Sequence, residues 1–291
     1  MDDLTADLAR RLVAEQFPAW AHLEVTGVER QGWDNRTFRL GTDLTVRLPS
    51  AAAYTPAVDK EHRHLPALAA HLPIPVPEPV ALGAPTGDFP HPWSIRRWLE
   101  GETIDVATGL DRDRLANDLG RLLTILRSAP AADGPAAGQH SFYRGCHPSA
   151  YADQVQAALR ELEARVDTAA CEAVWAAALT SVWEQSPVWF HGDIAAGNLL
   201  AANGRLSALI DFGTCGVGDP ACDLVIAWTY FDGDERRIFR EAAGLDEGAW
   251  RRARGWALWK ALILIARVPG ADTDGAQTRI LTEILTDPLT D

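Results

Sequence analysis

Polar side chains suited to metal-assisted chemistry surround one predicted β-hairpin in the second half of the chain. Its strands are expected at 198–201 and 206–210, with Asp193 before the hairpin, Asn198 at its start and Asp211 directly after it. A hairpin brings its two ends together, so Asn198 and Asp211 should face one point. Their amide and carboxylate oxygens are hard ligands suited to Mg²⁺, which takes its other ligands from water and phosphate. Asp193 would lie beside that metal, where a base that accepts a hydroxyl proton is needed.

This arrangement fits phosphoryl transfer, in which a positioned metal and a positioned nucleophile leave little covalent work to the protein. The step from Asp193 to Asn198 is the spacing of the protein-kinase catalytic loop, and Asp211 begins a literal Asp-Phe-Gly. The loop reads His-Gly-Asp where protein kinases usually have His-Arg-Asp. Each residue taken alone is equally typical of a turn or a strand end, but their joint register favours the catalytic interpretation.

The segments HGDIAAGNLL, IDFG and GVGDPACDL together resemble the aminoglycoside phosphotransferase family, a branch of the protein-kinase-like fold. The resemblance follows nearly the whole chain in order. It implies that Asp193 is the catalytic base and that Asn198 and Asp211 hold Mg²⁺. It also implies supporting roles around the catalytic loop for His191, Asp219 and Asp223.

The sequence offers another interpretation of the last two carboxylates. Asp219 precedes Pro220, which is a favourable first residue of a helix, so both aspartates also fit a helix start.

The segment at 32–38, Gly-Trp-Asp-Asn-Arg-Thr-Phe, resembles the phosphate-covering hairpin of that family. In this resemblance, backbone amides together with Asn35 or Arg36 reach the phosphate oxygens of ATP or GTP. A glycine beside Asp-Asn is also typical of an ordinary β-turn. The resemblance places the hinge that receives the nucleotide base at Arg97, Trp98 and Leu99.

Kinase-like sites also need a cation on the next strand, held by a carboxylate on the following helix. The chain has only two lysines, Lys60 and Lys260, and neither lies on the strand expected at 44–48. We therefore assign this role to Arg47, with Glu61 on the following helix as its partner. Arginine can bind phosphate or carboxylate through two parallel hydrogen bonds. It therefore supplies the same positive charge as the usual lysine, but its side chain differs in reach and shape. The alternative interpretation of Arg47 is an exposed strand cation.

The acceptor of the phosphoryl group is expected between Asp193 and the C-terminal helices. Aminoglycosides are polycations, and an acidic wall there would attract them and turn one hydroxyl toward the base. Solvated carboxylates at a helix start are an alternative interpretation. Trp256 and Trp259 could stack on a sugar or macrocycle, but their helical spacing is typical of a core. The carboxylates assigned to the wall are Asp232, Asp234 and Glu235.

We therefore expect a Mg²⁺-dependent O-phosphotransferase that uses ATP or GTP to phosphorylate a small hydroxylated molecule, first of all an aminoglycoside or another hydroxylated antibiotic. A metabolic kinase for an amino alcohol, a sugar or a sugar-amine shares all these catalytic residues and stays open. A nucleotide-binding module without catalysis is a third hypothesis, motivated by the missing strand lysine. The presence of Asp193, Asn198 and Asp211 together argues against it.

Two lobes are needed to position these residues. The first hundred residues are rich in predicted strands, including a hairpin turned at 41–43, and contain a helix over 58–71 that a run of prolines ends. We expect an α+β, bilobal, protein-kinase-like fold: a small β-rich nucleotide lobe over 1–100, a hinge at about 97–101, and a larger, mostly helical catalytic and acceptor lobe over 101–291. Helices of the second lobe are predicted at 111–127, 148–166, 168–183, 220–231, 234–243, 246–266 and 275–285.

The composition of the chain narrows the classes of molecule that it could bind and the compartment in which we expect it. The 40 acidic and 27 basic residues leave a formal charge of −13, which argues against a broad nucleic-acid footprint and is compatible with a cationic partner. The four cysteines show no metal-binding spacing. We therefore expect small buried thiols in a reducing compartment. The start of the chain is acidic, unlike a signal peptide, and the most apolar stretch is interrupted by Lys260. We expect a cytoplasmic protein with no membrane partner; the oligomeric state stays open.

Overall fold

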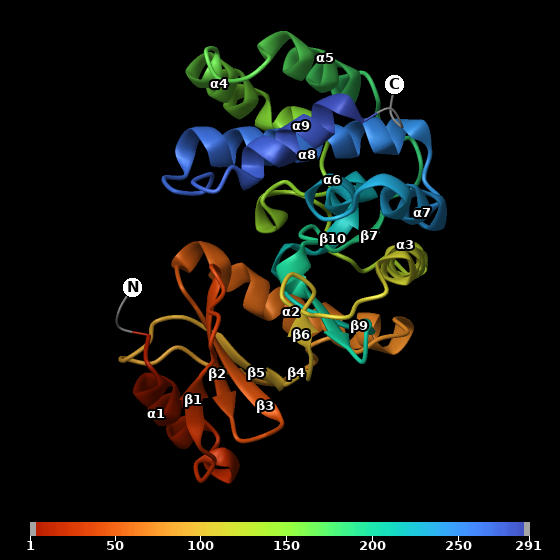
Figure 1. Ribbon diagram of the computed structural model, residues 1–291. Helices are drawn as coiled ribbons and strands as arrows, with labels where there is room; N and C mark the ends of the chain where they lie inside the picture. The colour runs from red at the N-terminus through yellow and green to blue at the C-terminus, as the bar shows by residue number, and fades with distance from the viewer. Residues whose placement is uncertain (1–3, 288–291) are drawn as a thin grey trace.

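A computed structural model describes residues 4–287 of the chain. Its elements divide into a sheet-rich N-terminal part and a mostly helical remainder, which occupy opposite ends of the molecule (Figure 1). The predicted α+β, bilobal architecture is confirmed. No helix within the described residues combines the length and the apolarity needed to cross a bilayer.

The N-terminal sheet has five antiparallel strands, and helix α1 (Ala6–Gln16) packs against it (Figure 1). Leu12 of α1 is fully buried with Leu40 and Trp93 of the sheet, which makes this a separate small core. The predicted hairpin turned at 41–43 is confirmed. In spatial order the strands are β1 (Val25–Gly27), β2 (Asn35–Leu40), β3 (Leu44–Pro49), β5 (Trp93–Arg97) and β4 (Pro79–Gly83).

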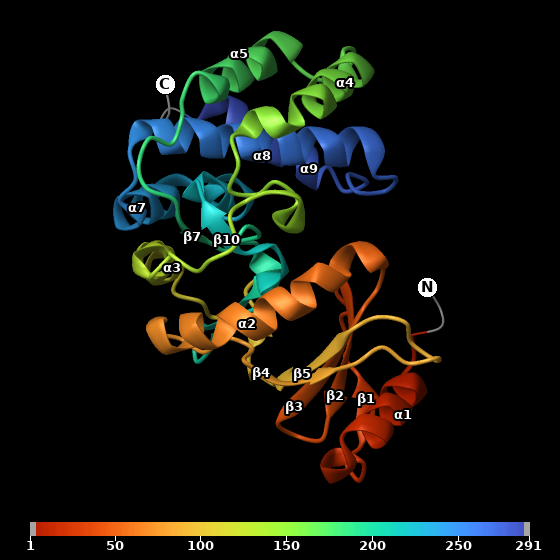
Figure 2. The same ribbon diagram turned by 180° about the vertical axis from the view of Figure 1, so that it is seen from behind.

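Helix α2 (Thr55–His71) lies between the sheet and the helical part (Figure 2). It begins three residues earlier than predicted, because Pro56 is accommodated in its first turn, where no intrahelical N–H bond is required. Glu61 is buried, and its carboxylate contacts Arg47 of β3 and Arg96 of β5. Leu65 and Leu68 belong instead to the large core of the helical part. Helix α2 therefore connects the two cores.

The helical part differs from prediction mainly at 220–231. This segment is a 3₁₀ turn, Pro220–Leu224, followed by one short helix rather than a continuous one. The tight turn presents the buried Asp223 carboxylate to the loop at 191–193. The helices are α3 (Arg112–Ser128), α4 (Ala152–Leu162), α5 (Thr168–Leu179), α6 (Ile226–Thr229), α7 (Gly233–Ala243), α8 (Glu247–Arg267) and α9 (Ala276–Thr286).

The predicted hairpin near residue 200 is confirmed as β8 (Leu199–Ala202) and β9 (Arg205–Leu209). Its turn residues Asn203 and Gly204 both have positive φ, 53° and 75°, as a tight two-residue hairpin turn requires. The short strand β6 (Glu102–Thr103) extends this sheet, and β7 (Val188–Phe190) pairs with β10 (Gly216–Gly218) beside it.

Candidate active site

The loop at 191–193 is held from two sides. The Asp223 carboxylate accepts hydrogen bonds from the backbone N–H groups of His191 (2.8 Å) and Gly192 (2.7 Å), while burial raises the pKa of Asp223. On the other side, Nε2 of His191 lies 3.0 Å from the carbonyl oxygen of Ile210, just after β9. His191 and Asp223 thus make the contacts that a support of this loop needs.

Gly192 explains why this loop has no arginine between its histidine and aspartate. Its φ is +88°, and a Cβ atom there would lie 2.9 Å from the carbonyl oxygen of Thr214. Both the backbone conformation and the space therefore require glycine.

Asp219 lies farther from the loop and anchors another element. Its carboxylate accepts from Nε (2.6 Å) and Nη2 (3.2 Å) of Arg252 on α8, and both side chains are buried. It also accepts from the N–H of Ala221, so it caps the turn at Pro220–Leu224. Asp219 therefore fits the helix-start interpretation, and its side-chain hydrogen bonds go to Arg252 and Ala221 and not to the loop at 191–193.

The hairpin brings the predicted catalytic residues together. Nδ2 of Asn198 donates to Oδ2 of Asp193 (3.0 Å) and to its carbonyl oxygen (2.9 Å). The N–H of Ile210 donates to the carbonyl oxygen of Asn198 (2.9 Å), so Asp211 follows directly on a residue bonded to Asn198. Asp211 itself has left-handed backbone angles, φ 65° and ψ 66°, a conformation that is uncommon for a residue other than glycine.

The donor atoms here fit a magnesium–nucleotide complex. The amide nitrogen of Asn198 is used by Asp193, which leaves its oxygen as the ligand atom. Asp211 contacts an arginine through Oδ1 and has a second carboxylate oxygen to offer. No group of three or more His, Cys, Asp or Glu side chains able to hold a metal occurs within residues 4–287. Two protein oxygens completed by phosphates and water are what Mg²⁺ commonly takes.

Arg47, on β3, lies between two carboxylates. Its Nη2 donates to Oδ1 of Asp211 (3.0 Å), and its Nη1 lies 3.8 Å from Oε2 of Glu61. Glu61 also forms an ion pair with Arg96 of β5, which sequence reasoning missed, and both of these side chains are almost fully buried. Glu61 therefore faces both guanidinium groups, and Arg47 reaches from the sheet to the Asp-Phe-Gly segment.

Lys60 holds the same segment from helix α2. Its Nζ donates to the carbonyl oxygen of Gly213 (2.7 Å) and to that of His140 (3.2 Å). The side chain is buried, and this burial lowers the pKa of Lys60. Consecutive residues of α2, Lys60 and Glu61, thus fix the position of 211–213 relative to the sheet.

The loop between β1 and β2 folds over strand β2. Gln31 exchanges hydrogen bonds of 2.9 Å with the backbone N–H and C=O of Thr37. Nη1 of Arg36 donates to the carbonyl oxygen of Gly32 (2.7 Å), so this guanidinium helps to hold the loop. Asn35, at the start of β2, is buried.

Asp34 in this loop lies close enough to Asp193 and Asp211 for their charges to act on it. Burial, with the charges of Asp211 and Asp193, raises the pKa of Asp34 to about 6, although Arg47 opposes the shift. The loop between β1 and β2 therefore brings a third carboxylate toward Asp193 and Asp211.

The predicted hinge has three different environments. The side chain of Arg97 is exposed and that of Leu99 is half-buried. The backbone N–H of Trp98 donates to the carbonyl oxygen of Asp43 (2.8 Å), and the guanidinium of Arg39 lies 4.0 Å from the centre of its ring. The buried indole N–H of Trp98 has no hydrogen-bond partner among the described residues.

The acidic wall assigned to the acceptor does not line the pocket beside Asp193. Asp232 is the N-cap of α7, exposed Asp234 pairs with Arg237, and Glu235 accepts from Arg112, with a distance of 2.6 Å to its Nη2. These carboxylates are used by the start of α7 and its neighbours, as their helix-start interpretation predicts.

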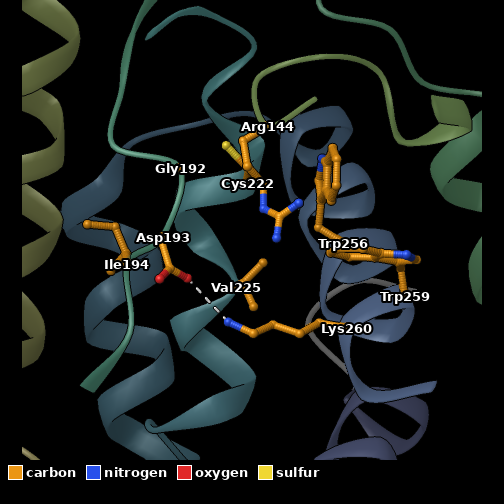
Figure 3. A pocket seen from close by; sticks show the side chains of 9 residues that line it. All are labelled: Arg144, Gly192, Asp193, Ile194, Cys222, Val225, Trp256, Trp259 and Lys260. Atoms are coloured by element: carbon orange, nitrogen blue, oxygen red, sulfur yellow. Dashed lines mark hydrogen bonds and ion pairs between the residues drawn. The ribbon is translucent and has the colours of Figure 1, made fainter. Parts of the chain in front are cut away.

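Cationic and aromatic side chains line that pocket instead (Figure 3). Nζ of Lys260, on α8, lies 3.3 Å from Oδ1 of Asp193, and the guanidinium of Arg144 lies across from them. Trp256 and Trp259 form another wall and are also part of the core, as their spacing predicts. Burial acts to raise the pKa of Asp193, but Lys260, with smaller contributions that include Arg144, outweighs it and lowers that pKa.

Sequence reasoning gave no site role to Lys60, Arg96, Arg144 or Lys260. For Lys260 a signal exists: it is the one charge inside the apolar stretch at 256–266, where a solvated lysine is out of place. The others come from distant segments whose approach the local pattern does not show.

Comparison with known proteins settles the family. Residues 25–256 match the phosphotransferase enzyme family (APH). The chain belongs to this family. It is thus a small-molecule kinase, a phosphotransferase with an alcohol group as acceptor. Among curated proteins, none matches the sequence.

Solved structures share the fold over nearly the whole chain. The GDP complex of wild-type aminoglycoside 2'-phosphotransferase-IIIa has a TM-score of 0.72 at 18% identity, covering 97% of this chain and 98% of that one. The streptomycin–ATP–APH(2")-IIa ternary complex has a TM-score of 0.61 at 18% identity, covering 98% and 97%. Macrolide 2'-phosphotransferase MphH from Brachybacterium faecium, as the apoenzyme, has a TM-score of 0.64 at 20% identity, covering 97% and 98%. These likenesses show the protein-kinase-like fold.

Proposed function

We propose that this protein is a Mg²⁺-dependent O-phosphotransferase that transfers the terminal phosphoryl group of ATP or GTP to a small molecule, with hydroxylated antibiotics as the first acceptors to test. One observation carries the proposal: Asp193 is bonded to Asn198 at one end of the β8–β9 hairpin, and Asp211 at the other end pairs with Arg47. In this proposal these four side chains supply the base, the two metal-ligating oxygens and the phosphate-binding cation. Membership in the family supports this assignment.

In the reaction, Asp193 accepts the proton of the acceptor hydroxyl while the hydroxyl oxygen attacks the terminal phosphorus. The bond from that phosphorus to the bridging oxygen breaks, and ADP or GDP leaves with its electron pair. Asn198 donates to Asp193 and so fixes the orientation of the carboxylate. Positioning and charge carry most of the rate, because the protein has little covalent work to do.

Asn198 and Asp211 would hold Mg²⁺, which when bound neutralises phosphate charge and orients the transferred group. Arg47, placed between Glu61 and Asp211, would contact the phosphates. We assign nucleotide binding to a lobe over 1–100 and acceptor binding to a lobe over 101–291.

The remaining donor-site assignments concern the loop before β2 and the hinge. Because the Arg36 guanidinium holds the carbonyl of Gly32, the backbone amides of the loop and Asn35 are the first candidates for phosphate contact. The residues assigned to the nucleotide base are Arg97, Trp98 and Leu99.

The test is transfer of label from γ-labelled ATP or GTP to a panel of hydroxylated antibiotics and metabolites, alongside growth protection in a susceptible host. We expect label on at least one acceptor class, lost when EDTA removes divalent cations. A protein that binds Mg–nucleotide but transfers label neither to any acceptor nor to water contradicts the proposal.

A metabolic small-molecule kinase is the second candidate. The observation that favours it is the chemistry beside Asp193, where Lys260 and Arg144 replace the carboxylates that a polycationic drug would need.

A further inference from the structure

The pocket beside Asp193 carries an excess of positive charge in a protein whose formal charge is −13. Lys260 and Arg144 both line it, and Asp193 is the only carboxylate among its lining residues. If Asp193 is the base, as the proposed function requires, an acceptor must bring its hydroxyl to this carboxylate. It must then lie against both cations.

Arg144 is fixed in place without an acidic partner. Its guanidinium lies 4.6 Å from the ring centre of Trp259 and 5.4 Å from that of Trp256, and Nη1 donates to the carbonyl oxygen of Phe142 (3.3 Å). Tyr151 stacks on Trp259 at 4.2 Å and so supports this aromatic platform. Within residues 4–287 no carboxylate lies within ion-pair distance of Arg144. A guanidinium held in this way can offer N–H groups to a carboxylate or phosphate.

Lys260 forms an ion pair with Asp193 itself. Its side chain is 35% exposed, and its contact with Asp193 is a single one at 3.3 Å. A half-exposed ion pair of this kind contributes little to stability and is readily exchanged. An anionic group on the acceptor would replace Asp193 as the partner of Lys260, which would free the carboxylate for the hydroxyl.

We infer that the acceptor carries an anionic group, a carboxylate or a phosphate ester, near the hydroxyl that is phosphorylated. Arg144 and Lys260 receive this group, and the hydroxyl points to Asp193. An acceptor with ammonium groups at the same place would meet two cations and lose electrostatic complementarity. The inference rests on the proposed function for the direction of the hydroxyl, and it specifies the substrate class of that site.

Three probes that differ only in charge test it: 4-(hydroxymethyl)benzoate, 4-(hydroxymethyl)benzamide and 4-(hydroxymethyl)benzylammonium. Their dissociation constants are measured on the full chain by ligand-observed NMR, with Mg²⁺ and a non-hydrolysable ATP analogue present. We expect the carboxylate to bind about tenfold or more tightly than the ammonium compound, with the amide between them, as one close charge contact allows. A fourth probe, 4-(hydroxymethyl)phenyl phosphate, compares phosphate with carboxylate.

Variants of the two cations test whether they cause the preference for the anionic probe. Arg144→Glu should reverse the order of the probes, Lys260→Gln should reduce the preference, and Arg144→Lys, which keeps a cation and guards against a folding defect, should retain it. Arg237→Gln, at an exposed arginine on α7, is the matched control and should leave the order unchanged. Equal affinities, tightest binding of the ammonium probe, no binding of any probe, or an order that Arg144→Glu leaves intact would each overturn the inference. Binding needs no turnover, so failure of the proposed function, seen as absent label transfer, is a separate result.

Discussion

At the scale of single residues, the site depends on arginines that share a small number of carboxylates. Glu61 faces both Arg47 and Arg96, and Arg47 reaches on to Asp211. A buried charge is tolerated only when it is paired, so Glu61 and Asp211 together make two guanidinium groups possible here. The guanidinium at position 47 spans two carboxylates because it is wider than an ammonium group.

Replacing Arg47 by lysine tests whether the site is shaped around guanidinium. A lysine ammonium is a compact charge that would not span Glu61 and Asp211 in the same way, so nucleotide affinity in Arg47→Lys should fall about tenfold. Calorimetric titration with Mg–ATP and Mg–GTP measures this. Unchanged or tighter binding would show that a lysine serves equally well.

Asp34 predicts a dependence of stability on pH. Its pKa of about 6 in the folded protein exceeds the ordinary 3.8, so the folded state binds the extra proton. The contribution of this group to stability is complete below about pH 4 and is lost as the pH rises through about 6. Asparagine does not titrate, so the Asp34→Asn variant should not lose this stability as the pH rises. The difference in free energy of unfolding, variant minus wild type, should therefore increase by ~1–2 kcal/mol from pH 4 to pH 8, after allowance for partial exposure.

Urea unfolding in EDTA, without nucleotide, measures this difference. Parallel stability curves for wild type and Asp34→Asn across pH 4–8 would show that Asp34 does not titrate as its surroundings indicate.

At the scale of elements, helix α2 connects the sheet to the Asp-Phe-Gly segment. One turn of it places Glu61 against the sheet arginines and Lys60 against the carbonyl oxygen of Gly213. The C-terminal half of α2 contributes Leu65 and Leu68 to the large core. Helix α2 therefore contacts both the strand that carries Arg47 and the segment that carries Asp211.

Lys60→Met tests this connection. Methionine keeps much of the side-chain volume but cannot donate to Gly213 or His140, so the segment at 211–214 should exchange its amide hydrogens faster, by about five- to tenfold, as loss of ~1 kcal/mol implies. Hydrogen exchange followed by mass spectrometry measures it, with helix α5 as an internal reference that should not change. Equal exchange at 211–214 in both proteins would mean that Lys60 does not stabilise the segment.

At the scale of the whole molecule, the sequence predicts what is close along the chain and misses what packing brings from afar. Asp193, Asn198 and Asp211 surround one hairpin, whose Asn-Gly turn is readable in the sequence, so their convergence could be predicted. Lys260 is 67 positions from Asp193, and its contact depends on how α8 packs beside the catalytic loop. No local pattern carries that information.

The net charge of the chain likewise does not predict the charge of the pocket beside Asp193. A total of −13 suggested an acidic surface for a cationic acceptor, yet the carboxylates of α7 serve its N-terminus and two cations face Asp193. Net charge describes the molecule as a whole, whereas the acceptor meets only the few side chains of one pocket.

The most direct test of the central claim is phosphoryl transfer by Asp193→Ala. With labelled nucleotide and Mg²⁺, transfer to an acceptor or to water should fall at least about 100-fold, because the base is gone, while Mg–nucleotide binding persists. Glu241→Ala, which removes an exposed carboxylate on α7, should keep the wild-type rate. Transfer by Asp193→Ala at the wild-type rate would show that Asp193 is not the base and would contradict the mechanism.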